Sequence, residues 1–321
     1  MARLIRGTLI LFLAITLLLT LANSRGAITL DALGLYLTKN GYGGAQLVHL
    51  GNFYHLPIQS SGKPGNLVVD TGSPMTLIFR SSLKGLNLTE SKTTKRVSGA
   101  FGRGGDVYGL TTIKAVTAGN CTLANMPVAI ASGSADSSFS RAHSNGLLGL
   151  RELIKFGAVL DLRNHLIYLR PSRPGSSVAS EIKSILSRQG YTAVPLLVSD
   201  NHLFIAGALN GVPCYFIVDT GGYVTAFDID FVTRAKLKVA GTRLVAESFG
   251  GRTSVGITIF PSLRIGNYEI KNGSASVARL SPEVLRSHSE IAGLIGVEYL
   301  AINRAIFDFV SDTLYLRPPA R

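Results

Sequence analysis

The sequence predicts a mainly β protein made of two homologous lobes with short helices, and three observations lead to this prediction. Runs of Val, Ile, Leu and Thr are interrupted by Gly and Ser about every 8–12 residues, which is typical of successive short strands. The tripeptide Asp-Thr-Gly occurs twice, at 70–72 and 219–221. Residues 146–171 align without gaps on residues 293–318, and both segments end in Tyr-Leu-Arg-Pro. A repeat of this length indicates an internal duplication.

Each half of the chain carries the same elements in the same order. A short helix comes first, and Gly41 is placed as its C-terminal stop. Strands lead to Asp-Thr-Gly, and a Gly-rich hairpin, further strands, an apolar segment with Gly, a short helix and a closing strand follow. We therefore place the lobes at 27–171 and 187–321, joined by a linker at 172–186 that begins with Pro, Gly and Ser.

The N-terminus has the pattern of a secretory signal peptide. A positively charged start is followed by an uncharged apolar run, and Ala22-Asn23-Ser24 supplies the small residues of a cleavage site. We expect cleavage after Ser24, so that residues 1–24 are a signal peptide and the protein is exported, either secreted or periplasmic. The alternative is an uncleaved membrane anchor, although the apolar run is short for a span of about 20 residues.

The charge of the chain bears on its partners. The 321 residues carry a formal net charge of +13, which indicates either an ordinary basic surface or attraction to a membrane or cell-envelope polymer. No run of Lys and Arg is interleaved with aromatic residues, so we expect no nucleic-acid partner. Six scattered histidines form no metal-binding motif, so we expect no metal.

The chain has only two cysteines, Cys121 and Cys214. Export would allow them to form a disulfide. They lie in different halves and at positions that are not equivalent in the repeat. We therefore expect two buried free thiols, with a single bridge as the alternative.

Both Asp-Thr-Gly segments place a carboxylate at the end of an apolar strand. An isolated motif of this kind is equally well explained as a turn that caps a strand. If two duplicated lobes pack about a twofold axis near these turns, however, Asp70 and Asp219 meet. Two carboxyl groups in contact share one proton, so that one serves as a base and the other as an acid toward a water molecule between them.

The motif residues are Asp70-Thr71-Gly72-Ser73, Asp219-Thr220-Gly221-Gly222, Leu147-Leu148-Gly149 and Leu294-Ile295-Gly296. They resemble those of the pepsin and retropepsin superfamily of aspartic proteases, and the resemblance covers nearly the whole mature chain. It implies a bilobal, pepsin-like acid-protease fold with two lobes like β-barrels. It also implies an aspartic endopeptidase that needs no cofactor and binds a polypeptide substrate, extended in the cleft between the lobes of a monomer.

The resemblance further implies that Asp70 and Asp219 are catalytic and that their neighbours support them. The two threonines would cross-bond the loops, the glycines would let backbone N–H groups approach the carboxylates, and Ser73 would donate to Asp70. Gly222 stands where a hydroxyl or Ala is usual, so we expect Asp219 to lose a hydrogen bond and Asp70 to ionise more readily. The supporting residues are Thr71, Gly72, Ser73, Thr220, Gly221 and Gly222.

A Gly-rich hairpin falls where these enzymes carry the flap that closes over substrate. Glycines provide the mobility that a lid needs, although an ordinary hairpin is the alternative. The hairpins of the two halves differ by one residue in length, so we expect a flap on each lobe, as in a fused retropepsin dimer. The expected flap residues are Phe101, Gly102, Gly104 and Gly105 in the first half, and Phe249 and Gly250 in the second.

A competing interpretation is a catalytically silent protein of the same fold that binds a polypeptide or glycan in the cleft. The presence of both motif aspartates argues against it. Two further aspartates, Asp161 and Asp308, precede the closing strands of the two halves, and we expect them to be structural.

Overall fold

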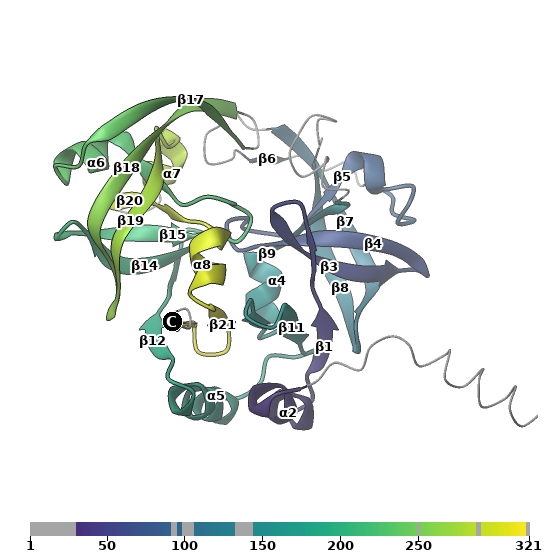
Figure 1. Ribbon diagram of the computed structural model, residues 1–321. Helices are drawn as coiled ribbons and strands as arrows, with labels where there is room; N and C mark the ends of the chain where they lie inside the picture. The colour runs from purple at the N-terminus through teal and green to yellow at the C-terminus, as the bar shows by residue number, and fades with distance from the viewer. Residues whose placement is uncertain are drawn as a thin grey trace, which may run out of the picture.

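The structure is a computed structural model. Its described strands form two eight-stranded sheets and one six-stranded sheet, with a lobe on either side of the molecule (Figure 1). This mainly β, two-lobed architecture confirms the predicted fold class. The expected signal peptide lies outside the described residues, which are 30–90, 95–97, 106–131, 144–248, 251–286 and 290–318.

The two eight-stranded sheets have the same strand order, one in each lobe. The N-terminal sheet runs β2 (Val48–Leu50), β3 (Phe53–Ser60), β4 (Lys63–Asp70), β9 (Gly146–Gly149), β5 (Leu77–Phe79), β8 (Cys121–Ala131), β7 (Asp106–Ala118) and β6 (Lys95–Val97). The C-terminal sheet runs β13 (Leu197–Ser199), β14 (His202–Leu209), β15 (Val212–Val218), β20 (Ile291–Ile295), β16 (Ala226–Asp228), β19 (Tyr268–Ala278), β18 (Gly251–Ile265) and β17 (Val239–Ser248). The repeat in the sequence is therefore a repeat of the fold.

The centre of each sheet carries the Asp-Thr-Gly segment. β4 runs parallel to β9, which places Asp70 opposite Gly149, and β15 and β20 pair in the same way. Leu67, Val68 and Val69 of β4 are at most 1 % exposed. Their burial on both faces explains why this strand is a continuous apolar run rather than an alternating one.

The six-stranded sheet joins the lobes at their base. Its two central strands come from different lobes and pair antiparallel, with Leu160 opposite Phe307. The lobes therefore share main-chain hydrogen bonds as well as side-chain packing. The order is β1 (Gly43–Gln46), β11 (Leu166–Leu169), β10 (Val159–Asp161), β21 (Ile306–Asp308), β22 (Thr313–Leu316) and β12 (Thr192–Pro195).

Two helices, α2 (Ala32–Lys39) and α5 (Ser176–Arg188), lie side by side below this sheet (Figure 1). Leu37 of α2 and Ile182 of α5 share an apolar cluster with Tyr168 of the sheet, and all three are at most 1 % exposed. Burial of this apolar face holds the helices against the sheet.

Each of these helices is followed by a glycine in the left-handed backbone region. Gly41 has φ +80° and Gly190 has φ +79°, a conformation that other residues rarely adopt. This confirms Gly41 as the stop of the first helix. Helix α5 begins inside the segment 172–186 that we expected as the linker.

The remaining helices are short, and two of them directly follow the apolar-Gly segments. None of the helices in the described ranges is long and apolar enough to cross a membrane. The short helices are α4 (Leu150–Lys155), α6 (Ile229–Arg234), α7 (Pro282–Arg286), α8 (Val297–Ile302) and the 3₁₀ helix η1 (Arg80–Ser82).

Each lobe buries one cysteine. Cys121 begins β8 and Cys214 lies in β15, and both are buried and free. This confirms the expectation of two free thiols. Burial raises the pKa of both thiols, to about 12 for Cys214, so neither is a ready thiolate nucleophile.

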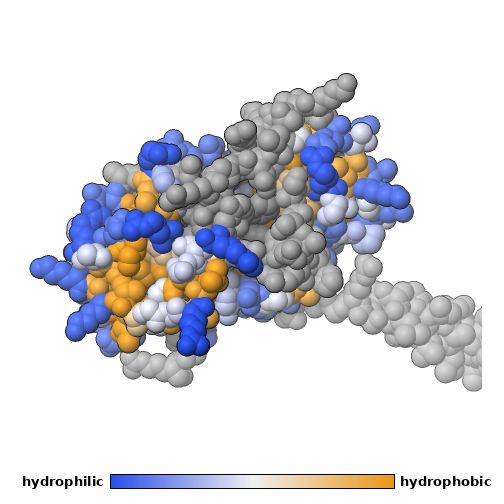
Figure 2. Space-filling model, turned by 90° about the horizontal axis from the view of Figure 1, so that it is seen from above, coloured by the Kyte–Doolittle hydropathy of each residue, from blue (hydrophilic) through white to orange (hydrophobic). Residues whose placement is uncertain are grey.

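Exposed apolar side chains gather on the outside of the C-terminal lobe, as Figure 2 shows. Ile259 is the most exposed of them, at 74 %. In the described part of the N-terminal half, the exposed large apolar side chains are Leu35 and Val48. The outer apolar residues of the C-terminal lobe lie on β17 and β18 and are Val239, Leu244, Val245, Ile257 and Ile259.

Candidate active site

Each motif carboxylate lies where a buried strand meets a turn. Asp70 is the last residue of β4, and Asp219 directly follows β15. The backbone N–H of Asp219 donates to the carbonyl oxygen of Ile295 at 3.0 Å, which ties this turn to β20. Asp70 is only 6 % exposed, whereas Asp219 is half-buried.

Two threonines link these turns across the boundary between the lobes. Thr71 Oγ1 donates to the carbonyl oxygen of Val218 at 2.7 Å and accepts from the N–H of Thr220 at 3.0 Å. Thr220 Oγ1 donates to the carbonyl oxygen of Val69 at 2.7 Å and accepts from the N–H of Thr71 at 3.0 Å. Both threonines are fully buried, so four buried backbone groups depend on the two hydroxyls.

Backbone N–H groups point at both carboxylates. The N–H groups of Gly72 and Ser73 donate to Asp70 Oδ1 at 2.9 and 3.0 Å. The equivalent pair in the second loop donates to Asp219 Oδ1 at the same distances, 2.9 and 3.0 Å. The two loops therefore offer their carboxylates the same hydrogen bonds.

The structure corrects the expected role of the Ser73 hydroxyl. It donates to the carbonyl oxygen of Met75 at 2.9 Å, so the residue supports Asp70 through its N–H and not through its side chain. Gly222 in the equivalent position therefore does not deprive Asp219 of a hydrogen bond that Asp70 has. The expectation that Asp70 ionises more readily loses its basis.

The glycines of the two loops allow the carboxyl groups to meet. A Cβ atom on Gly72 would lie 2.4 Å from Asp219 Oδ1, and one on Gly221 would lie 2.2 Å from Asp70 Cγ. No side chain fits at either position without displacing the opposite carboxyl. Each carboxyl group therefore lies against the glycine of the opposite loop, and the two groups interact directly enough to shift each other's pKa.

Burial and mutual repulsion set the protonation of the pair. Desolvation, followed by the charge of Asp219, raises the pKa of Asp70 well above its ordinary value. Desolvation also raises the pKa of Asp219, but its hydrogen bonds and the charge of His202 lower it in part. Because Asp70 is the more deeply buried, burial favours its protonated form more than that of Asp219. This preference is the reverse of the one that we expected from Gly222.

A glutamate supports each loop, fully buried in the N-terminal lobe and half-buried in the C-terminal lobe, and the sequence did not reveal it. Glu152 Oε2 accepts from the N–H of Thr76 at 2.8 Å and from its hydroxyl at 2.6 Å. The hydroxyl of Thr76 in turn accepts from the N–H of Gly149 at 3.1 Å. In the C-terminal lobe, Glu298 accepts from the N–H of Thr225.

The alignment of the halves hides these glutamates. With residues 146–171 set on 293–318, Glu298 falls opposite Arg151 rather than Glu152. Both glutamates stand in the first turn of a short helix, at its third position in α4 and its second in α8. A search for an acidic residue within the first turn after each apolar-Gly segment would have found them.

The other repeated aspartates have turn-forming partners. Asp161 accepts from the guanidinium of Arg163 at 2.9 Å and from the N–H of Asn164 at 3.0 Å. Asp308 accepts from the N–H of Val310 at 2.9 Å, and burial raises its pKa. These contacts are structural. Within the described ranges, no three His, Cys, Asp or Glu side chains gather as a metal site would require.

The expected flap residues lie outside the described residues. They are Phe101, Gly102, Gly104, Gly105, Phe249 and Gly250. The flanking strands are described, since β6 pairs with β7 and β17 pairs with β18. Figure 1 shows β6 and β17 on the same upper side of the molecule, each at the edge of its own sheet.

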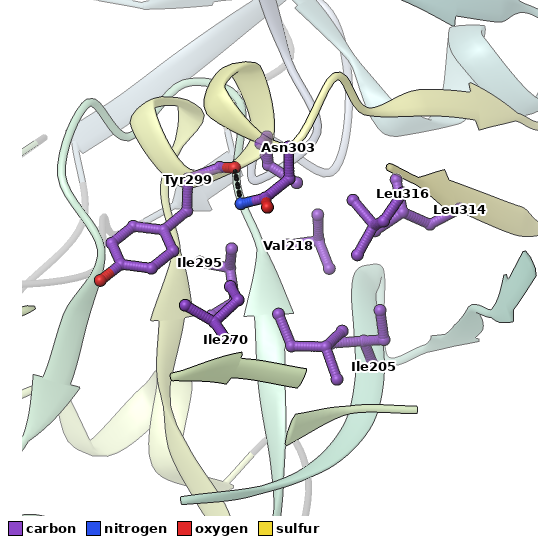
Figure 3. Close-up of a pocket in the computed structure, with 10 residues that line it drawn as sticks. Ile205, Val218, Ile270, Ile295, Tyr299, Asn303, Leu314 and Leu316 are labelled. Carbon is purple, nitrogen blue, oxygen red and sulfur yellow. Dashed lines mark hydrogen bonds between the residues drawn. The ribbon is translucent and has the colours of Figure 1, made fainter. Parts of the chain in front are cut away.

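A small apolar cavity of about 10 Å³ lies in the C-terminal lobe beside Val218, the residue before Asp219 (Figure 3). Val218 and Ile295, from the two strands that hold the loop, line it together with Asn303. This volume is at the lower limit for one water molecule, so the cavity is a packing defect and not a substrate pocket.

Comparisons with known proteins agree with this geometry. The sequence profile of the aspartyl protease family matches twice, over residues 56–151 and 205–299, and each match contains one Asp-Thr-Gly. The structure is similar to that of an aspartic proteinase from Irpex lacteus, with a TM-score of 0.50 and 14% identity, over 87% of this chain and 98% of the other. At this identity the similarity shows the fold alone. No curated protein sequence matches the chain.

Proposed function

We propose that this chain, which belongs to the aspartyl protease family, is an aspartic endopeptidase that hydrolyses peptide bonds with a water molecule activated between Asp70 and Asp219. The observation that carries the proposal is the meeting of two carboxyl groups from different lobes, each packed against the glycine of the opposite loop. Such a pair holds one proton between two sites and therefore supplies an acid and a base at the same place.

The reaction follows from the protonation of the pair. Ionised Asp219 removes a proton from the water, whose oxygen attacks the carbonyl carbon, while Asp70 gives its proton to the carbonyl oxygen. A neutral gem-diol results. When a gem-diol hydroxyl returns a proton to Asp70 and Asp219 protonates the amide nitrogen, the C–N bond breaks and the pair is restored.

The cross-bonded threonines account for the precision that this chemistry needs. Four hydrogen bonds of 2.7–3.0 Å fix one loop to the other below the carboxyl groups. A pre-positioned acid and base avoid the entropic cost of assembling them around the water molecule.

The substrate is a polypeptide that lies extended between the lobes and adds a strand to the cleft walls. Tyr223 and Val224, directly after the second loop, are 44 % and 40 % exposed, and they offer apolar contact beside Asp219. Apolar substrate side chains next to the cleaved bond suit this surface. The signal-peptide pattern in residues 1–24 supports action outside the cytoplasm.

The test is cleavage of an unfolded protein between pH 3 and 7, about the range that a shared-proton pair suggests. We expect cleavage by the wild type, inhibition by a statine-type peptide, and a loss of about 100-fold or more in Asp70→Asn and in Asp219→Asn. Mass spectrometry of the fragments measures all three results.

The matched control is Asp230→Asn, which removes an exposed carboxylate that pairs with Arg279 on the surface. This variant should cleave as the wild type does. A wild type that binds peptides but cleaves none over the whole pH range would contradict the proposal and identify a silent binding protein of this fold.

A further inference from the structure

A different residue follows in the neighbouring strand of each lobe where the strand runs on toward the carboxylate. β3 pairs antiparallel with β4 in a register that sets His55 opposite Val68, and β14 pairs with β15 so that Phe204 is opposite Ile217. These are the last paired residues of the two ladders, and continuing each register by two residues leads to Phe53 and Asp70 in one lobe and to His202 and Asp219 in the other. Alternate residues of a strand lie on the same face, so Phe53 and His202 are on the face that carries the carboxylates.

The two lobes carry the same two residue types in opposite order. In the N-terminal lobe, Phe53 is beside the carboxylate and His55 is fully buried one step behind it. In the C-terminal lobe, His202 is beside the carboxylate and the fully buried Phe204 is behind it, with the two rings 6.0 Å apart. Phe53 is 7 % exposed, whereas His202 is half-buried and in contact with solvent.

One ring nitrogen of His202 is held by the backbone. Nδ1 lies 2.8 Å from the carbonyl oxygen of Asp200, and because a carbonyl only accepts, Nδ1 carries the hydrogen. Among the described residues Nε2 has no hydrogen-bond partner. A histidine side chain that is positively charged stabilises a nearby carboxylate.

The charged groups around His202 are few in the described part of the chain. Asp219 lies at the end of β15, Asp70 interacts with it, and Asp200 contributes its backbone in the preceding turn. Helix α7 shares an apolar cluster with Phe204 through Val284 and ends at Arg286. The acidic groups near His202 are therefore the carboxyl pair and Asp200.

We propose that His202 is a positioning residue that makes Asp219 the base of the pair, because its imidazole lies on the strand beside Asp219 where the N-terminal lobe has Phe53. The inference rests on the proposed function. The two loops give their carboxylates the same hydrogen bonds, so the asymmetry comes from outside the loops. The charge of His202 stabilises ionised Asp219, and the buried ring of Phe53 limits the hydration of Asp70.

The experiment follows one carboxyl group at a time by NMR of ¹³C-labelled aspartate. Each single variant leaves one titrating aspartate. The pKa of Asp219 in the Asp70→Asn variant should be lower than the pKa of Asp70 in the Asp219→Asn variant. Adding His202→Phe to Asp70→Asn removes the cation, so the pKa of Asp219 should rise by about 0.5–1 pH unit. Adding Phe53→His to Asp219→Asn should lower the pKa of Asp70 by a similar amount.

His202→Gln separates charge from packing, because it keeps a polar side chain but cannot become a cation. If His202 acts through its charge, Gln behaves as Phe does, whereas a merely structural role would leave Gln equal to the wild type. In the enzyme with both aspartates, loss of the cation should move the acid limb of kcat/KM to higher pH by the same 0.5–1 unit or so. His165→Asn, at an exposed left-handed turn position, is the control and should shift neither value.

The outcomes distinguish this inference from the proposed function. Equal carboxyl pKa values in the two single Asn variants, or a titration of Asp219 that is unchanged in His202→Phe and His202→Gln, would overturn the inference even if the enzyme cleaves peptides. An NMR shift of the expected sign in a protein that cleaves nothing would support the electrostatic role of His202 and overturn the proteolytic function.

Discussion

Thr71 Oγ1 in the N-terminal lobe and Thr220 Oγ1 in the C-terminal lobe each donate to a carbonyl oxygen of the other lobe at 2.7 Å. The surroundings of these bonds are less alike, since Phe53 stands near one carboxylate and His202 near the other. The comparison teaches that the contacts that hold the loops are the same in both lobes, whereas the residues on the strands beside the two carboxylates are not. The loops are therefore symmetric in their hydrogen bonds, and the two carboxylates differ in the side chains of the neighbouring strands.

The cores of the two lobes also have different residues at equivalent positions. Phe156 caps α4 and is 1 % exposed, whereas Asn303 occupies the equivalent cap of α8. Cys121 at the start of β8 corresponds to Tyr268 at the start of β19, whose hydroxyl donates to Asn303 Oδ1 at 2.5 Å. One lobe has an aromatic ring where the other has a hydrogen-bonded amide and a cavity beside it.

The largest effect should come from breaking the symmetric contact between the loops. In Gly72→Ala or Gly221→Ala, the new Cβ would collide with the opposite carboxyl at 2.4 or 2.2 Å. The carboxyl groups must move apart, so kcat/KM on a peptide should fall about 100-fold or more, and by similar factors in the two variants. Near-UV circular dichroism checks that both variants remain folded.

A suitable control is Gly175→Ala, since a Cβ at that position meets no atom within 4 Å. It should retain the wild-type rate. Full activity in Gly72→Ala, or rates that differ by more than about tenfold between the two loop variants, would show that the lobes do not contribute equally to the geometry.

The next effect concerns stability. Thr71→Val keeps the shape of the side chain but leaves the carbonyl of Val218 and the N–H of Thr220 without partners in a buried region. We expect a loss of about 2–4 kcal/mol in the free energy of unfolding, and the same loss in Thr220→Val. Urea denaturation followed by far-UV circular dichroism measures both.

Thr71→Ser and Thr220→Ser retain the hydroxyl and should recover most of the stability. If one Val variant is more stable than the other by more than about 1 kcal/mol, the two cross-links are not energetically equivalent, although their distances are.

The fold and the carboxyl pair could be predicted from the sequence because they depend on residues that allow no substitute. A Cβ at Gly149 would lie 2.2 Å from the backbone carbon of Met75, and one at Gly296 would lie 2.5 Å from that of Val224. Where sterics demand glycine, both copies of a duplicated lobe retain it, and the repeat remains visible. The strand order then follows from the repeat.

The rest could not be predicted because other residues can meet the same physical need. A glutamate reaches the loop threonine from either of two positions in a helical turn, so Glu152 and Glu298 fall out of register. The protonation order that we propose depends on the direction of the Ser73 hydroxyl and on the pairing of β14 with β15, which brings His202 to the strand beside Asp219. Neither is visible before the chain is folded.

The smallest effect concerns the cavity beside Asn303. Asn303→Leu alone would strand the buried hydroxyl of Tyr268 and should lower the free energy of unfolding by about 1–3 kcal/mol. Adding Tyr268→Phe removes both polar partners together, and the larger apolar side chain fills space lined by Val218 and Ile295. The double variant should therefore equal or exceed the wild type by about 1 kcal/mol in urea denaturation.

The reverse change sharpens the comparison. Phe156→Asn puts an amide into the apolar core of the N-terminal lobe. The position equivalent to Tyr268 is Cys121 there, so no tyrosine hydroxyl is present to bond the amide. We expect the free energy of unfolding to fall by about 3–5 kcal/mol. We infer that each core is stable because its two residues match each other. A stable Phe156→Asn variant together with an unstable double variant of Tyr268 and Asn303 would contradict this. Peptide cleavage by the double variant should stay at the wild-type rate, because neither catalytic aspartate lines the cavity.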